Sequence, residues 1–205
     1  MFSLLRLSAA IACLVVALPA RAGGLEQLQR FLESTTAARG AFSQTVISRA
    51  GRKPQQSAGI FALQRPGKFR WSYELPYPQL LVSDGKQFWS YDPELKQAVK
   101  KPVGQALGGS PAALLAGGDL QRHFTLRDDG EADGLHYAEA TPRQAEASFT
   151  RIRIGLRDAL PVVMEIEDSF GQTTQLRFTR FERNPALDPG LFRFVLPAGA
   201  DVVGE

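Results

Sequence analysis

The sequence has few of the side chains from which enzymes build active sites. Its 205 residues include one cysteine, Cys13, and two histidines, His123 and His136. The histidines lie far apart and no other pair has metal-ligand spacing, so the sequence predicts no metal site. It also lacks a Gly-x-Ser-x-Gly nucleophile turn and a glycine-rich phosphate loop with its lysine. We therefore expect no enzyme activity and no cofactor.

An excess of charge of one sign is absent as well. The chain has 24 basic and 21 acidic residues, and Arg6 and Arg21 precede the expected mature chain, which leaves 22 against 21. Proteins that attract nucleic acid through their overall field carry a marked basic excess. The near balance argues against a nucleic-acid partner.

Long hydrophobic runs are limited to Leu7–Ala17, which is too short for a bilayer that requires ~20 residues. This run follows the positively charged start MFSLLR and precedes the small-x-small site Ala20-Arg21-Ala22. Together these features indicate a secretory signal peptide. We expect residues 1–22 to be cleaved after Ala22 and residues 23–205 to form one exported domain. That mature chain would have no cysteine, and hence neither disulfide nor thiol chemistry.

The segment Ala10-Ile11-Ala12-Cys13 supports a second interpretation, because it resembles a bacterial lipoprotein acylation site. Acylation at Cys13 would produce a membrane-anchored protein instead. Cleavage there would leave only Leu7–Ile11 as the apolar core, which is shorter than the usual core of about 7–15 residues. We therefore favour cleavage after Ala22.

One amphipathic helix is expected at the start of the mature chain, over Gly23–Ala38. Leu25, Leu28, Phe31 and Leu32 recur at three- and four-residue spacing and form one apolar stripe. Gly40 is a plausible end signal.

After Gly40 the sequence consists mainly of short alternating runs separated by turn residues, which is typical of antiparallel sheet. Asp84-Gly85 is a strong hairpin signal. About eleven strands are too many for a flat sheet, so we expect a mainly β protein with helices (α+β) and a strongly curved or nearly closed sheet. The predicted strands are Phe42–Arg49, Ser57–Gln64, Phe69–Glu74, Leu80–Ser83, Gln87–Tyr91, Gln97–Lys101, Phe124–Asp128, Leu135–Ala140, Ser148–Leu156, Pro161–Ser169, Thr173–Phe181 and a short Phe192–Leu196.

Only Pro102–Leu120 interrupts this pattern. Ser110 as cap, Pro111 in the first turn and Gly117-Gly118 as stop predict a short helix. In a β protein such a helix either plugs one end of the core or acts as a movable lid.

Aromatic side chains alternate along the predicted strands. Period two places Phe69, Trp71 and Tyr73 on one face of a strand, with Lys68 and Arg70 on the other. Such rows either form an ordinary packed core or line a cavity for an apolar ligand. Similar rows are Phe88 with Ser90, Trp89 with Tyr91, Ile152 with Ile154 and Leu156, and Leu176 with Phe178.

Arg65 is out of place in this pattern, because it stands in register with Phe61 and Leu63, where a strand would bury an apolar side chain. Pro66-Gly67 after it has the residues of a type II turn. That turn suits a tight hairpin poorly, so we expect a slightly longer loop here.

Several stretches together resemble the outer-membrane lipoprotein carrier family, LolA, and the match covers essentially the whole mature chain in order. The stretches are FSQ at Phe42–Gln44, GIFALQRPGKFRWSYELPYPQLLVSDGKQFWSYDPELKQ at Gly59–Gln97, SPAALL at Ser110–Leu115, DSFGQTTQLRF at Asp168–Phe178 and FRFVLPAGADV at Phe192–Val202.

The resemblance implies an incomplete antiparallel β-barrel, covered by the N-terminal helix and short lid helices, that encloses a hydrophobic cavity. The cavity takes the acyl chains of outer-membrane lipoproteins released by an inner-membrane ABC transporter of the LolCDE type. The carrier crosses the periplasm, acts as a monomer and delivers its cargo to the outer-membrane receptor LolB. It makes and breaks no covalent bond.

The resemblance also implies residue roles. Arg65 matches the arginine that hydrogen-bonds to the lid helix and holds the cavity shut, and the lid residues are Pro111, Leu114 and Leu115. The alternative for Arg65 is that it simply exits to solvent at a turn. Phe69 matches a position at the cavity mouth. The expected acyl-binding residues are Phe61, Leu63, Phe69, Trp71, Tyr73, Trp89, Tyr91, Ile152, Ile154, Met164 and Phe178.

Three other functions stay open at this point. The chain could be a LolB-like receptor anchored through Cys13, or a LolA-like paralogue that carries another acylated or lipidic ligand. An exported hydrolase on a β scaffold would need a nucleophile and a base that the sequence does not place.

Overall fold

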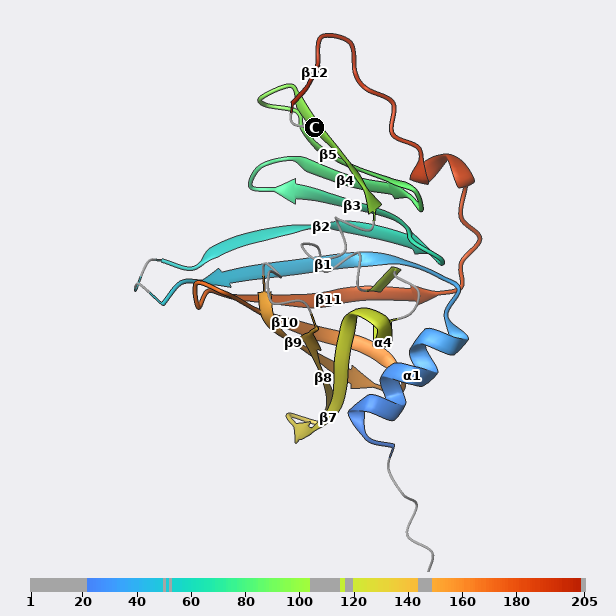
Figure 1. Ribbon diagram of the computed structural model, residues 1–205, viewed down its shortest axis with the longest axis vertical. Coiled ribbons are helices and arrows are strands. Elements are labelled where there is room, and N and C mark those ends of the chain that lie inside the picture. The colour runs from blue at the N-terminus through green and yellow to red at the C-terminus, as the bar shows by residue number, and fades with distance from the viewer. Residues whose placement is uncertain are drawn as a thin grey trace, which may run out of the picture.

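A computed structural model of the chain describes residues 22–49, 51, 53–103, 115–116, 120–143 and 149–203. Its main feature is one curled sheet of twelve strands in the order β12-β6-β5-β4-β3-β2-β1-β11-β10-β9-β8-β7 (Figure 1). The sheet is open, because β12 and β7 stand at its two ends. The strands are β1 (Ala37–Ile47), β2 (Gln55–Gln64), β3 (Lys68–Leu75), β4 (Gln79–Asp84), β5 (Gln87–Asp92), β6 (Gln97–Pro102), β7 (Phe124–Ala132), β8 (Leu135–Pro142), β9 (Phe149–Arg157), β10 (Leu160–Asp168), β11 (Thr173–Arg183) and β12 (Asp201–Val202).

Eleven of these strands pair antiparallel, and only the two-residue β12 pairs parallel, with β6. The strongly curved antiparallel sheet predicted from the sequence is therefore confirmed. The chain passes from β6 to β7 through a region that contains Leu115 and Ala116 and the short helix α4 (Leu120–His123). Among the described residues, none of the helices combines the length and the hydropathy needed to cross a membrane.

Helix α1 (Gly24–Ser34) is shorter than the predicted Gly23–Ala38, and Gly40 does not end it. Ala37 and Ala38 instead begin β1, where they are buried. Gly40 lies inside β1. A Cβ at this position would fall 2.0 Å from the carbonyl oxygen of Arg180 on β11. The glycine thus permits close approach of two backbones.

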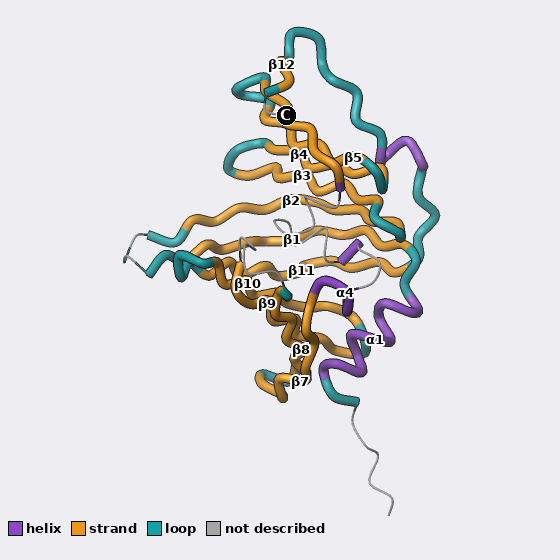
Figure 2. Tube along the Cα trace, viewed as in Figure 1, coloured by secondary structure: helices purple, strands orange, loops and turns teal. Residues whose placement is uncertain are grey.

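The predicted strand Phe192–Leu196 is wrong. Residues Pro189–Phe192 form a 3₁₀ turn, η1, and the next strand is β12. Asp188 explains the turn, since its Oδ1 accepts a hydrogen bond from the backbone N of Gly190 at 2.8 Å and Pro189 follows as first turn residue. Figure 2 shows this segment leaving β11 and running past the ends of the central strands toward β12.

The register of the central strands sorts side chains onto two faces. Phe61 of β2 stands opposite Trp71 of β3, and Leu63 stands opposite Phe69. These side chains are at most 4% exposed and belong to the main buried cluster on the inner, concave face. Helix α1 packs against β7, β8, β9 and β10, so that it closes one end of that face (Figure 1).

Candidate functional site: an apolar interior and its latch

Arg65 lies at the end of β2, where the chain turns into β3. Its Nε and Nη2 donate to the carbonyl oxygen of Leu115 at 3.2 and 2.9 Å. Its Nη1 donates to the carbonyl oxygen of Leu32 at 3.1 Å and also to that of Thr35. One guanidinium therefore joins the segment between β6 and β7 to the C-terminal end of α1.

The end of α1 is a suitable partner for a cation. The last four carbonyls of a helix have no partner within it, and they carry a partial negative charge. Leu32 lies in the last turn of α1, and Thr35 is the first residue after the helix. A guanidinium has five donors, enough to serve two groups of carbonyls at once.

The surroundings of Arg65 are largely apolar. The guanidinium carbon lies 4.8 Å from the centre of the Phe31 ring, a distance that permits a cation–π interaction. Burial removes water from the charged form and lowers the pKa of Arg65 to about 10. The side chain still carries its positive charge at neutral pH, so it binds the carbonyls as a cation.

The backbone of the same turn adds to these contacts. The N of Gly67 donates to the carbonyl oxygen of Ala116 at 2.8 Å, and the N of Arg65 donates to that of Thr36 at 2.8 Å. Gly67 has a φ of +70°, and Gln64 pairs with Lys68, so three residues form the loop. The loop is one residue longer than a two-residue hairpin, as the sequence suggested.

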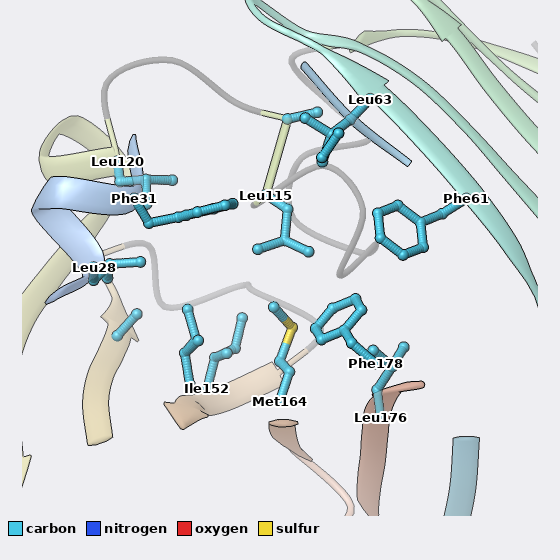
Figure 3. Packing of buried hydrophobic residues seen from close by; sticks show 14 of the residues in the cluster. Leu28, Phe31, Phe61, Leu63, Leu115, Leu120, Ile152, Met164, Leu176 and Phe178 are labelled. Carbon is cyan, nitrogen blue, oxygen red and sulfur yellow. The ribbon is translucent and has the colours of Figure 1, made fainter. Parts of the chain in front are cut away.

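Of the predicted lid residues, Leu115 is described and Pro111 and Leu114 lie outside the described residues. Leu115 is fully buried, and so is Ala116 beside it. Figure 3 shows the Leu115 side chain pointing into the interior, between Phe31 of α1 and Phe61 of β2. Leu115 therefore closes the interior with its side chain while its carbonyl is held by Arg65.

Most of the predicted wall residues meet in one buried cluster on the concave face. Phe61 and Trp71 lie 5.3 Å apart between ring centres, and Phe61 and Phe178 lie 5.4 Å apart. Tyr73 is at the margin, where its hydroxyl donates to Oε1 of Gln44 at 3.1 Å. The predicted residues in the cluster are Phe61, Leu63, Phe69, Trp71, Ile152, Ile154, Met164 and Phe178.

The prediction that Trp89 and Tyr91 line the interior is wrong, because they lie on the opposite face of the sheet. Their rings pack on Phe194 of the C-terminal segment, at 5.0 and 5.7 Å between centres. The β4–β5 register is the cause: Ser83 stands opposite both Phe69 and Phe88, so Phe88, and not its neighbour Trp89, shares the inner face. The sequence offered both rows and no means of choosing between them.

Phe42 is a wall residue that the sequence did not single out. It is 2% exposed, and its ring centre lies 4.4 Å from that of Trp71. The available signal was Gly59, which faces Phe42 across the β1–β2 pair and leaves room for its ring. Phe31 and Leu28 of the predicted helical stripe also enter the interior (Figure 3).

These features define a class of protein: a single curled antiparallel sheet whose apolar concave face is closed by a helix and by a hydrogen-bonded segment. The side chains of this interior are aromatic and aliphatic. The chain belongs to the outer membrane lipoprotein carrier protein LolA family, whose model matches residues 33–195.

Curated relatives agree over nearly the full length. An outer-membrane lipoprotein carrier protein of Dechloromonas aromatica is 53% identical over 187 residues, which cover 91% of this chain and 90% of the relative. One of Methylobacillus flagellatus is 46% identical over 201 residues, which cover 96% and 98%.

Solved structures support the fold alone, since their sequences are distant. A LolA superfamily protein from Nitrosomonas europaea superposes with a TM-score of 0.51 at 12% identity, covering 83% of this chain and 96% of the other. An uncharacterized conserved protein from Thermus thermophilus gives a TM-score of 0.53 at 19% identity, covering 87% and 96%.

Proposed function

We propose that this protein carries outer-membrane lipoproteins across the periplasm, with their acyl chains in its apolar interior. The observation that carries the proposal is the closure by Arg65, which ties Leu115 and α1 over the cluster that contains Phe61 and Trp71. Hydrogen bonds to backbone carbonyls are reversible, so the interior has a cover that opens without covalent chemistry. The curated relatives, which are named as outer-membrane lipoprotein carriers, support the same function.

The physical need for such a carrier follows from the cargo. Transfer of an acyl chain into water costs about 0.8 kcal/mol per CH₂ group. A triacylated protein therefore requires a shielding partner in an aqueous compartment. The wall of aromatic and aliphatic side chains supplies many weak contacts, which suits a carrier that must also release its cargo.

The closure of the interior by Leu115 and Arg65 determines how cargo enters. Leu115 occupies the interior, so cargo enters only when Leu115 leaves and Arg65 gives up its carbonyl. The two states must lie within a few kcal/mol of one another, since otherwise the acyl chains could not shift the population toward the open state. Arg65 stays charged throughout and acts as a latch.

The partners and the compartment are part of the proposal. An inner-membrane ABC transporter of the LolCDE type would load the carrier, and the outer-membrane receptor LolB would accept the cargo. The leader at residues 1–22 would direct export and be cleaved after Ala22, and residues 23–205 would act as a single domain and as a monomer. The carrier itself would catalyse no reaction and need no cofactor.

A release assay tests this function. Inner-membrane vesicles that contain the transporter and a labelled lipoprotein are incubated with ATP and the purified protein, residues 23–205, and then sedimented. We expect labelled lipoprotein in the supernatant as a complex with the carrier on a sizing column, and none without ATP. Lipoprotein that stays in the pellet with active transporter present would refute the proposal. In cells, depletion of the protein should strand lipoproteins in the inner membrane.

Mass spectrometry of the exported N-terminus separates the carrier from an anchored receptor. A carrier starts with a free Gly23. An acylated Cys13 would instead indicate a LolB-like protein.

A further inference from the structure

A groove of about 760 Å³ lies on the outer, convex face of the sheet, and Phe61 and Phe181, which pack in the apolar interior, also contribute to its lining. Its floor includes Ile60 and Ala62 of β2 and Arg70 of β3, which alternate with the inward-facing Phe61 and Phe69. Its outer wall is the C-terminal segment over residues 186–191. The volume falls within the range of about 300–1,000 Å³ that is usual for small-ligand sites.

The outer wall is held at the end where the chain leaves β11. The side chain of Asn184 donates through Nδ2 to the carbonyl oxygen of Ser34 at 2.8 Å and accepts from the N of Thr36 at 2.9 Å. The backbone N of Asn184 also donates to the carbonyl oxygen of Ala37 at 2.7 Å. These bonds fix the starting point of the segment that spans the groove.

The far end of the wall is held as well. Phe192 is 2% exposed, and Nη1 of Arg70 donates to the carbonyl oxygen of Leu191 at 3.4 Å. The segment between Asn184 and Phe192 therefore stands off the sheet between two fixed points. The groove beneath it is preformed.

The lining is largely apolar at the centre. Ile60 is 46% exposed, although it sits in the middle of a strand. Ala186, Leu187 and Leu191 face it from the wall. Apolar side chains on both sides of a groove favour a hydrocarbon ligand.

One charged side chain that lines the groove is free to bind a ligand. Nε of Arg39 is paired with Oε2 of Glu182 at 2.6 Å. Arg70 donates to the carbonyl oxygen of Leu191, and the Asp188 side chain caps the η1 turn. Within the described residues, the exposed guanidinium of Arg180 has no hydrogen-bond or ion-pair partner. A guanidinium at the rim of an apolar groove favours a ligand with an anionic end.

We propose that this outer groove binds a single-chain amphiphile, with its tail along Ile60 and Leu187 and its anionic head group at Arg180. The site is separate from the interior and adds a second lipid site to the molecule. A carboxylate and a phosphate meet the same guanidinium chemistry, so a fatty acid and a lysophospholipid are the two sources to compare.

Calorimetric titration of residues 23–205 tests the proposal with four ligands below their micellar concentrations. Oleate and lysophosphatidylglycerol have anionic head groups, lysophosphatidylcholine is zwitterionic, and oleyl alcohol is neutral. We expect both anionic ligands to bind, and Arg180→Glu to weaken them by about tenfold or more while leaving oleyl alcohol unchanged. Tighter binding of lysophosphatidylglycerol than of oleate would identify a phosphate head group, and the reverse a carboxylate.

Two further variants locate the site. Ala186→Trp fills the groove from its exposed wall and should abolish the binding of oleate and lysophosphatidylglycerol. Arg177→Glu is the matched control, because Arg177 is exposed on the same strand but does not line the groove. It should change the affinity by less than about twofold. Circular dichroism checks that each variant is folded.

The outcomes separate the outer groove from the carrier function. Equal oleate affinity in wild type, Arg180→Glu and Ala186→Trp would overturn the groove proposal, and so would an absence of oleate binding to the wild type. Normal lipoprotein release by Ala186→Trp, together with lost oleate binding, would support two separate sites. A failed release assay with intact groove binding would refute the carrier function alone.

Discussion

The carbonyl oxygen of Leu115 receives two hydrogen bonds from Arg65, at 2.9 Å from Nη2 and 3.2 Å from Nε. The two residues are 50 positions apart in the chain. The same guanidinium reaches Leu32 and Thr35 at the end of α1. One side chain thus holds two separate segments over the interior, beside the backbone hydrogen bonds of the same turn.

Replacement of Arg65 by leucine should let the protein accept lipoprotein but slow its onward transfer. The change removes the charged hydrogen bonds, each worth about 1.5–3 kcal/mol, that favour the closed state. Cargo-loaded carrier should accumulate in a transfer assay with receptor-containing membranes. Arg65→Lys keeps the charge but loses the two-point contact to Leu115, so its rate should fall between those of wild type and Arg65→Leu. Unchanged transfer kinetics in Arg65→Leu would contradict the latch.

The two tryptophans provide a matched pair of reporters for cargo binding, because Trp71 faces the interior and Trp89 lies on the opposite face. A triacylated lipopeptide with brominated chains should quench the fluorescence of Trp89→Phe, which retains only Trp71. It should leave Trp71→Phe, which retains only Trp89, nearly unchanged. Quenching of neither variant would favour a packed core without a ligand space.

A buried carboxylate on the outer face should make part of the stability depend on pH. Glu139 is 4% exposed and accepts two hydrogen bonds from Arg127, at 2.7 and 2.9 Å, and these bonds lower the pKa of its carboxyl group. The contribution is therefore complete above the unfolded pKa of about 4.3 and is lost as the pH falls through the lower folded value.

Urea unfolding of Glu139→Gln measures this contribution. Because Arg127 is largely exposed, we expect a loss of only about 1 kcal/mol at pH 7. The difference from wild type should shrink as the pH falls through the lowered folded pKa of Glu139, below which both proteins carry a neutral group at this position. A difference that stays constant over this range would exclude ionisation of Glu139 as the cause.

Asn184 should anchor the C-terminal segment through both its backbone and its side chain. It has a φ of +54°, and its side chain bonds to Ser34 and Thr36. Asn184→Gly keeps the backbone conformation but loses the side-chain bonds, for which we expect about 1–2 kcal/mol of lost stability. Asn184→Ala should cost about 1 kcal/mol more, because alanine disfavours positive φ.

Denaturant unfolding gives these energies, and limited proteolysis after residue 184 reports release of the segment. Equal stability of the glycine and alanine variants would show that the backbone conformation contributes nothing. Stability equal to wild type in the glycine variant would exclude the side-chain clamp.

Periodicity was sufficient for most of the fold, because the strands are amphipathic and the turn residues between them are distinct. It failed where a segment is fixed by contacts distant in sequence. Phe192–Leu196 alternates like a strand, yet the cap by Asp188 and the burial of Phe192 impose a turn. The end of α1 was misplaced for a similar reason, since Ala37 and Ala38 gain more from pairing with β2 than from extending a helix.

In the site, too, periodicity predicted some residues and failed for those whose placement depends on register. The inward rows at Phe69, Trp71 and Ile152 follow from period two once a strand is recognised. The choice between Phe88 and Trp89 depends on cross-strand register, which a single sequence does not fix. The contact of Arg65 with α1 also depends on register, because Gln64 pairs with Ala37 and so brings the turn beside the helix end.

The short parallel strand β12 has a consequence for self-association. It covers the outer edge of β6 at Gln97 and Ala98, where the N of Asp201 donates to the carbonyl oxygen of Lys96 at 2.9 Å and the N of Val203 donates to that of Ala98 at 2.8 Å. An uncovered strand edge offers the same backbone groups to any second sheet, and edge-to-edge pairing is a common start of aggregation. The chain thus occupies, with its own backbone, the start of the β6 edge, where a second carrier could otherwise add its sheet.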